Sequence, residues 1–85
     1  MALWQLNSTI LPASLALLKP TDALLFKRDA VYLLLQQHTY ATNQLFVLQQ
    51  DAHARNIQLP SSVQAIDDAQ WVELTLKHQQ VVQCQ

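Results

Sequence analysis

The 85-residue chain contains no glycine, and this absence limits the conformations that its turns can adopt. Glycine adopts positive φ angles without a steric penalty and lets the backbone approach a ligand closely. The loops that cradle phosphates in nucleotide-binding proteins depend on such glycines. Nucleotide binding of the Rossmann or P-loop kind is therefore excluded.

The chain carries much apolar material for its length. Hydrophobic residues make up 51% of it and charged residues only 13%, whereas a domain of this size hides only about 60 to 65% of the surface that its unfolded chain exposes. Apolar surface left uncovered usually marks contact with a partner. We therefore expect a single domain over residues 1–85 that works as a subunit of a larger assembly.

Charge and cysteine content argue against several functions. The formal net charge of -1 provides no broad field for nucleic acid, so direct binding to nucleic acid is not expected. The histidines at 38, 53 and 78 match no zinc spacing. The first basic residue is Lys19, and no run of eighteen apolar residues occurs, which argues against a signal peptide and a membrane span. The sequence predicts a cytoplasmic protein without metal, cofactor or membrane contact.

Short apolar runs alternate with helix-forming segments. The expected strands cover residues 1–6, 21–27, 44–50, 61–67 and 80–84, and the expected helices cover 11–19, 28–39, one turn at 51–56, and 67–78. Strands that alternate with helices form a parallel sheet through right-handed crossovers. The predicted fold class is α/β, with a small parallel sheet of four to five strands and helices on both faces in a three-layer, flavodoxin-like arrangement.

The last predicted helix has two distinct sides. Its inward stripe consists of Trp71, Leu74, Thr75 and His78. On the opposite side, Glu73 and Lys77 are four residues apart and are expected to form an ion pair worth about 0.2 to 0.5 kcal/mol. His78 and, in the second helix, His38 are expected to cap the helix ends by hydrogen bonds to the last carbonyls.

Asp67 and Asp68 stand at the start of that helix. A pair of acidic residues can serve in acid–base catalysis, but acids at a helix start are explained by capping and by the helix dipole. Gln70, three residues after Asp67, completes the pattern of a capping box. Capping is therefore the favoured interpretation.

The helix predicted over residues 28–39 is apolar on more than one side. Val31, Leu34 and Leu35 form one stripe, while Tyr32 and Leu33 face elsewhere. A helix that lies on a sheet needs only one apolar stripe. We therefore predict that Tyr32 and Leu33, together with Phe26, contact another subunit.

Lys27 and Arg28 are the only adjacent basic pair in the sequence. Two charges are too few for a nucleic-acid footprint. Their place directly after the second predicted strand puts them at the carboxyl edge of the sheet, where α/β folds bind ligands. This pair is the charged position at which a search for function should begin.

Three segments of the chain resemble the TusB/DsrH members of the DsrE/DsrF/DsrH family. They are LLKPTDALLFKRDAV at 17–31, QLFVLQQDAHARN at 44–56 and VQAIDDAQWVELTLKHQQVVQC at 63–84. The third is the most specific, because Ile66-Asp67 is followed by an aromatic residue, Val72, Leu74, Thr75 and Lys77-His78. The chain departs from the family by its lack of glycine around the second strand, a shortened segment before the third, and Cys84 where an aromatic residue is expected.

The resemblance implies a parallel α/β fold and a non-catalytic subunit of a sulfur relay. In that relay TusC-like and TusD-like subunits assemble with this one into a heterohexamer. A cysteine of the TusD-like subunit accepts persulfide sulfur from TusA and passes it through TusE towards 2-thiolation of the tRNA wobble uridine. The resemblance assigns the present chain a scaffolding role in this complex.

Cys84 leaves an alternative open. A sulfur carrier needs an exposed thiolate whose pKa is lowered by neighbouring cations or a helix amino terminus, and Gln83 and Gln85 supply no charge. As a small hydrophobic residue at a strand end, Cys84 needs no further role. The rival hypotheses are a sulfurtransferase that carries persulfide on Cys84, as in DsrH-dependent sulfur oxidation, and a self-associating α/β module unrelated to sulfur.

Overall fold

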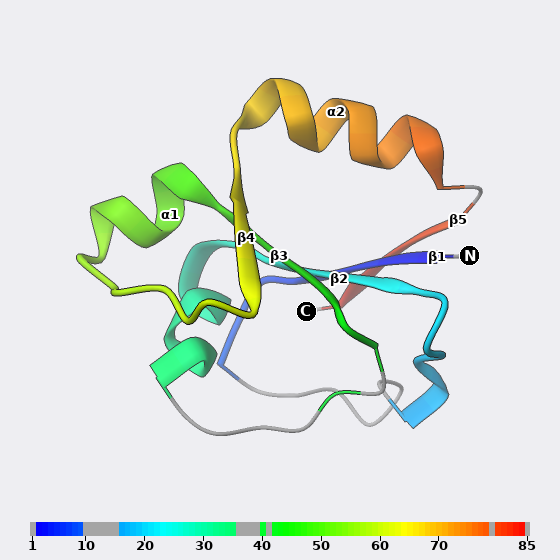
Figure 1. The fold of residues 1–85 in the computed structure, drawn as a ribbon, viewed down its shortest axis with the longest axis horizontal. Helices are drawn as coiled ribbons and strands as arrows, with labels where there is room; N and C mark the ends of the chain where they lie inside the picture. Colours follow the sequence, from blue (N-terminus) through cyan, green and yellow to red (C-terminus); the bar gives the residue numbers. More distant parts are fainter. Residues whose placement is uncertain (1, 10–15, 36–39, 41, 79, 85) are drawn as a thin grey trace.

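The computed structural model describes residues 2–9, 16–35, 40, 42–78 and 80–84. Its strands are β1 Ala2–Leu6, β2 Ala23–Phe26, β3 Gln44–Leu48, β4 Val63–Ile66 and β5 Gln80–Cys84. Its helices are the 3-10 helix η2 Arg28–Leu35 and the α-helices α1 Gln49–Ala54 and α2 Asp68–Lys77. All neighbouring strands pair in parallel, in the order β4-β3-β2-β1-β5. The predicted α/β class with a parallel sheet is confirmed (Figure 1).

The order of the strands explains the layers. The chain steps in one direction from β1 to β2, β3 and β4, and then returns past β1 to form β5. Because crossovers are right-handed, connections made in opposite directions lie on opposite faces of the sheet. Accordingly α2, the connection from β4 to β5, covers one face, while η2 covers the other (Figure 1). Ala52 of α1 belongs to the same core cluster as the buried residues of η2.

The centre of the sheet is buried on both faces. All four residues of β2 are 0% exposed, and Leu24 and Phe26 face the layer of η2 and α1 while Ala23 and Leu25 face α2. A parallel strand covered on both sides requires such a continuous apolar run. The fully apolar sequence ALLF therefore suits a central strand that is covered on both faces.

The buried carboxylate of Asp22 holds the beginning of the sheet together. One oxygen accepts hydrogen bonds from the Ala2 backbone N–H at 2.9 Å, and the other accepts from Trp4 Nε1 at 3.2 Å and from the Lys19 N–H at 3.0 Å. The Thr42 hydroxyl donates to the Asp22 carbonyl. Asp22 therefore joins the starts of β1 and β2 to the turn before β2 and the segment before β3.

These bonds also determine the ionisation of Asp22. Burial favours the neutral acid, but the hydrogen bonds from Lys19, Ala2 and Trp4 stabilise the carboxylate, so that the pKa of Asp22 is lowered below 3.8. The group is charged in the folded protein at neutral pH. Its contribution to stability is present above pH 3.8 and is lost as the pH falls through the lowered pKa.

The two ends of α2 follow the sequence prediction. Asp67 accepts a hydrogen bond from the Gln70 N–H at 2.8 Å, and the Gln70 side chain accepts one from the Asp67 N–H at 3.0 Å, which completes the capping box. At the other end, His78 Nδ1 lies 2.8 Å from the Leu74 carbonyl oxygen. The capping roles of Asp67 and His78 are confirmed, whereas His38 lies outside the described residues.

The predicted ion pair on α2 is wrong. Among the described residues, the structure places no ion pair between Glu73 and Lys77, although both stand on the exposed side of α2. Two long side chains in water gain little from pairing and lose rotamer freedom when they do. The outward side of α2 instead carries the exposed apolar side chains of Val72 and Leu76.

Several element boundaries differ from the prediction. The first predicted helix falls mostly outside the described residues; within them Ala16 and Leu17 are in a 3-10 turn, and Leu18 and Lys19 are not helical, because Lys19 belongs to a turn in which its carbonyl accepts the Asp22 N–H at 2.9 Å. β3 ends at Leu48, since Gln49 and Gln50 already begin α1. The second helix is a 3-10 helix as far as Leu35, and residues 36–39 lie outside the described part.

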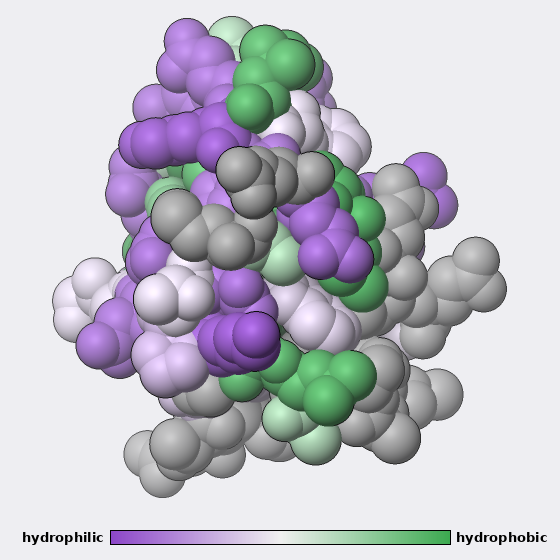
Figure 2. Space-filling model, turned by 90° about the vertical axis from the view of Figure 1, so that its right-hand side faces the viewer, coloured by the Kyte–Doolittle hydropathy of each residue, from purple (hydrophilic) through white to green (hydrophobic). Residues whose placement is uncertain are grey.

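On the side at which the strands begin, the described residues form no single continuous apolar face (Figure 2). Figure 2 shows hydrophobic side chains in separate groups among hydrophilic ones, with one group at the top over α2. No helix within the described ranges is long and apolar enough to cross a membrane.

We predict that Asp22→Asn lowers the free energy of unfolding at neutral pH by about 2 to 3 kcal/mol, because its amide nitrogen cannot accept the hydrogen bonds that the carboxylate accepts. Urea unfolding between pH 7 and pH 2 measures this difference. The loss should shrink as the pH falls below 3.8. The exposed acid in Glu73→Gln is the matched control, and an Asp22→Asn variant as stable as the native protein would show that the hydrogen bonds contribute nothing.

Candidate functional site

The candidate site lies at the carboxyl edge of β2. Lys27 follows the last residue of β2, and its backbone N–H donates to the Leu6 carbonyl at the end of β1 at 3.0 Å. The Lys27 carbonyl accepts the Ala30 N–H at 3.1 Å as η2 begins. The ladder between β1 and β2 and the start of η2 therefore fix the Lys27–Arg28 pair at the edge that the sequence predicted.

Lys27 is almost buried although it is charged. Its side chain crosses to the layer of α2, where Nζ lies 4.9 Å from the ring centroid of Trp71 in a cation–π contact, and the residue is only 9% exposed. Burial lowers the pKa of Lys27 from its usual value, the nearby Arg28 lowers it further, and Asp51 opposes both effects. The ammonium group is thus held in an environment that disfavours its charge.

Arg28 has a strained backbone. Its φ angle is 54°, which lies in the left-handed region that costs a non-glycine residue about 1 kcal/mol or more. The Arg28 N–H donates to Asp51 Oδ2 at 2.8 Å, and this bond to α1 holds the conformation. In a chain without glycine, Arg28 takes a conformation that glycine usually supplies.

A network of charged groups joins η2 to α1 beside this pair. Arg55 Nη2 lies 3.0 Å from Asp29 Oδ1, and Arg55 Nη1 lies 3.8 Å from Asp51 Oδ1. The Arg55 guanidinium also lies 6.0 Å from the ring centroid of Tyr32. Arg55 therefore neutralises the two carboxylates that stand closest to the start of η2, and it fixes α1 relative to that helix.

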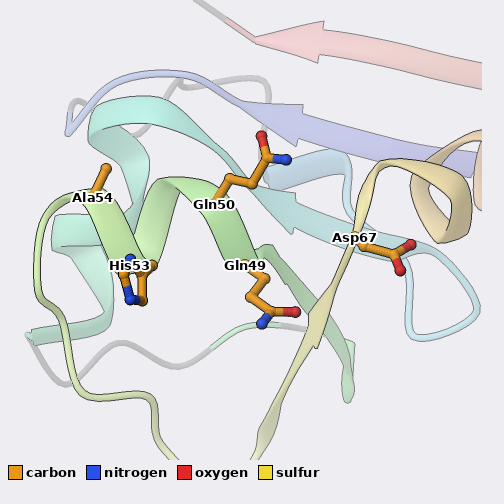
Figure 3. A pocket seen from close by; sticks show the side chains of 5 residues that line it. All are labelled: Gln49, Gln50, His53, Ala54 and Asp67. Carbon is orange, nitrogen blue, oxygen red and sulfur yellow. The ribbon is translucent and has the colours of Figure 1, made fainter.

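An open hollow of about 440 Å³ lies at the same edge of the sheet. It is lined by Gln49, Gln50, His53 and Ala54 of α1 and by Asp67 before α2. Figure 3 shows that these side chains point in different directions and that the Asp67 carboxylate is directed away from α1. The hollow does not present a set of converging catalytic groups, and within the described ranges no cluster of histidine, cysteine and acidic residues could hold a metal ion.

Cys84 is the last residue of β5, as predicted. It pairs with Leu6 at the carboxyl end of β1, on an edge strand of the sheet. Lys77 and His78 come before the beginning of β5, so the length of that strand separates them from Cys84. These two residues, the basic residues closest to Cys84 in the sequence, therefore lie at the opposite edge of the sheet.

The predicted interface residues occupy three different environments. Phe26 is 0% exposed and packs edge to face on Tyr40, with ring centroids 5.6 Å apart, and Leu33 is 3% exposed. Both side chains are thus covered by the chain itself, and their predicted contact with another subunit remains a prediction. Tyr32 is 41% exposed and remains a candidate for contact with a partner.

The helix type explains why Leu33 is buried. In a 3-10 helix, residues three apart share a side, because one turn contains three residues. Leu33 therefore lies in line with buried Ala30, while Leu35, which is 64% exposed, lies in line with Tyr32. The exposed apolar pair of η2 is Tyr32 and Leu35.

Sequence reasoning found the Lys27–Arg28 pair but missed the residues that surround it. Trp71 was assigned only to the inward side of α2, and Asp51 and Arg55 to one helical turn. No local pattern marks Trp71 and Asp51 as neighbours of Lys27, or Arg55 as a partner of Asp29, because these residues come from segments far along the chain. The composition of the site depends on the tertiary fold.

We predict that the pH dependence of stability distinguishes Lys27 from an ordinary surface lysine. Between the lowered pKa of Lys27 and the usual 10.5, the unfolded chain binds more protons than the folded chain, so the free energy of unfolding gains a contribution that rises with pH. The native protein should therefore gain stability relative to Lys27→Met as the pH rises from 7 towards 10.5. Urea unfolding followed by circular dichroism measures both.

The matched control is Lys77→Met, which removes an exposed lysine from α2. Its difference from the native protein should not follow that trend. A Lys27→Met difference that is equally independent of pH would show that the folded protein leaves the ionisation of Lys27 unchanged.

Comparison with protein-family models identifies the relatives of the chain. The model described as "DsrH like protein" matches residues 5–81, which include all of β2, β3, β4, α1 and α2. Comparison with curated proteins gives no match. This family implies a sulfur-relay role beside DsrE-like and DsrF-like partner subunits. The chain belongs to the DsrH-like protein family.

Proposed function

We propose that this chain is a non-catalytic, TusB-like subunit of a TusBCD-type sulfur-relay complex in the cytoplasm. It assembles with TusC-like and TusD-like subunits into a heterohexamer that supports 2-thiolation of the tRNA wobble uridine. The TusD-like subunit carries the sulfur. The match to the DsrH-like family over residues 5–81 is the observation on which the relay function rests.

The position of Cys84 supports the non-catalytic role. A reactive cysteine requires a cation or a helix amino terminus beside its sulfur to stabilise the thiolate. Lys77 and His78 lie at the opposite end of β5 from Cys84, and α2 begins beyond β4 on the far side of the sheet. The two basic residues closest to Cys84 in the sequence therefore do not lie beside it, and Lys27 and Arg28, at the same carboxyl edge, are two strands away.

The exposed side of η2 supports the subunit role. Tyr32 and Leu35 present apolar surface on the same side of this helix, and the Arg55 guanidinium lies beside the Tyr32 ring. Aromatic residues and arginine are enriched at protein interfaces. A partner subunit that covers this side would bury the apolar surface that the isolated chain leaves in water.

Co-expression with TusC-like and TusD-like proteins of the same organism tests the proposal. We expect a stable ternary complex in size-exclusion chromatography with mass detection. After loading with persulfide sulfur, intact-mass analysis should find the added sulfur on the TusD-like chain and none on this chain. Added sulfur on this chain that is lost in Cys84→Ser would establish the sulfurtransferase alternative, and assembly with itself alone would support the self-associating module.

The interface prediction is tested by Tyr32→Ser combined with Leu35→Ser. Both side chains are exposed in the isolated chain, so the double variant should fold normally but weaken assembly by about tenfold or more, since buried aromatic contacts dominate interface energies. Val72→Ser with Leu76→Ser is the matched control, because it removes exposed apolar side chains from the opposite layer. Titration of the variants against the partner subunits measures the dissociation constants, and equal effects of the two double variants would contradict a specific role of η2.

A further inference from the structure

Two adjacent basic residues stand at the carboxyl edge of β2, and their charges are close enough to repel each other. Within that part of the chain, neither Lys27 Nζ nor the Arg28 guanidinium forms an ion pair or a hydrogen bond. Lys27 is nonetheless nine-tenths buried. Most of the Lys27 side chain is thus withdrawn from water, and a charge held in such a place gains from a nearby counter-charge.

The neighbouring carboxylates are already engaged elsewhere. Asp51 accepts the Arg28 backbone N–H and faces Arg55. Asp67 accepts the Gln70 N–H at the start of α2. Asp51 acts on Lys27 favourably from nearby, but it forms no ion pair with Lys27 among the described residues. The two basic side chains therefore remain available to a ligand.

The backbone of the same two residues is held in a costly arrangement. Arg28 stands in the left-handed region at φ 54°, and such strain tends to occur at functional sites. Beside Lys27, the Trp71 Nε1 atom is buried and has no hydrogen-bond partner among the described residues. A buried donor without a partner is rare in proteins and requires an explanation. The strained backbone of Arg28, the Lys27 ammonium group without an ion-pair partner and the Trp71 N–H without an acceptor thus belong to neighbouring residues within the described part of the chain.

We propose that Lys27 and Arg28 form a binding site for a small anionic group, with the indole of Trp71 as its inner wall. The recognised chemistry is a negative charge spread over several acceptor atoms, as in an inorganic oxyanion or a carboxylate. An anion between Lys27 and Arg28 supplies the missing counter-charge and reduces their repulsion. The site belongs to this chain alone and does not require the partner subunits.

The two tryptophans of the chain provide a measurement with an internal control. Trp4 Nε1 donates to Asp22 at the amino edge of the sheet, whereas Trp71 lies beside Lys27. In a ¹⁵N-labelled sample of the full chain, the indole N–H resonances are followed as thiosulfate, phosphate or acetate replaces chloride at constant ionic strength. We expect a saturable shift of the Trp71 resonance and none of the Trp4 resonance.

Variants decide whether Lys27 and Arg28 bind the anion. Lys27→Met should raise the dissociation constant by about tenfold or more, the loss expected when one charged contact of roughly 1.4 kcal/mol is removed. Arg28→Ala should weaken binding to a smaller extent, and Lys77→Met should leave it unchanged. A shift that does not saturate, that affects Trp4 equally, or that persists in Lys27→Met would overturn the proposal.

The choice of anion identifies the source of the ligand. Tighter binding of thiosulfate or phosphate than of acetate assigns the site to a free oxyanion. Acetate binding of equal strength assigns it to a carboxylate that a polypeptide can supply. Either result supports an anion site, and neither depends on whether the chain joins a relay complex.

Discussion

The buried carboxylate of Asp22 is the interaction on which the rest of the sheet depends. It accepts hydrogen bonds from the start of β1, from Trp4 and from the turn before β2, and its own carbonyl accepts the Thr42 hydroxyl. Parallel strands are joined by long crossovers and lack hairpin turns to set their register. In a chain with no glycine, one polar side chain aligns the amino ends of the central strands and so determines which residues reach the carboxyl edge.

The alignment of the central strands also positions the residues of the candidate site. β2 is buried over its whole length, and the residue that follows it must leave the sheet where β1 also ends. Because α2 crosses the face opposite to η2 and α1, the Lys27 side chain meets Trp71 of α2 while its own backbone begins η2. The site is therefore formed where the two layers of helices meet around the end of one strand.

Much of the fold could be predicted from the sequence because its information is local. The apolar run of β2, the capping box of Asp67 and the strand that contains Cys84 are all found where the pattern placed them. The orientation of residues in η2 could not be predicted, since α-helical periodicity was assumed and the segment forms a 3-10 helix. That difference exchanges Leu33 for Leu35 on the exposed side. The burial of Lys27 could not be predicted either, because it depends on Trp71 from a helix far along the chain.

The central claim is that this member of the DsrH-like family supports sulfur transfer without carrying sulfur itself. The most direct measurement is the amount of 2-thiouridine in tRNA from cells that lack the gene for this chain and carry a plasmid copy of either the native or the Cys84→Ser form. Our account predicts that 2-thiouridine is lost on deletion and restored equally by both forms. An unchanged amount after deletion, or restoration by the native form alone, would contradict it.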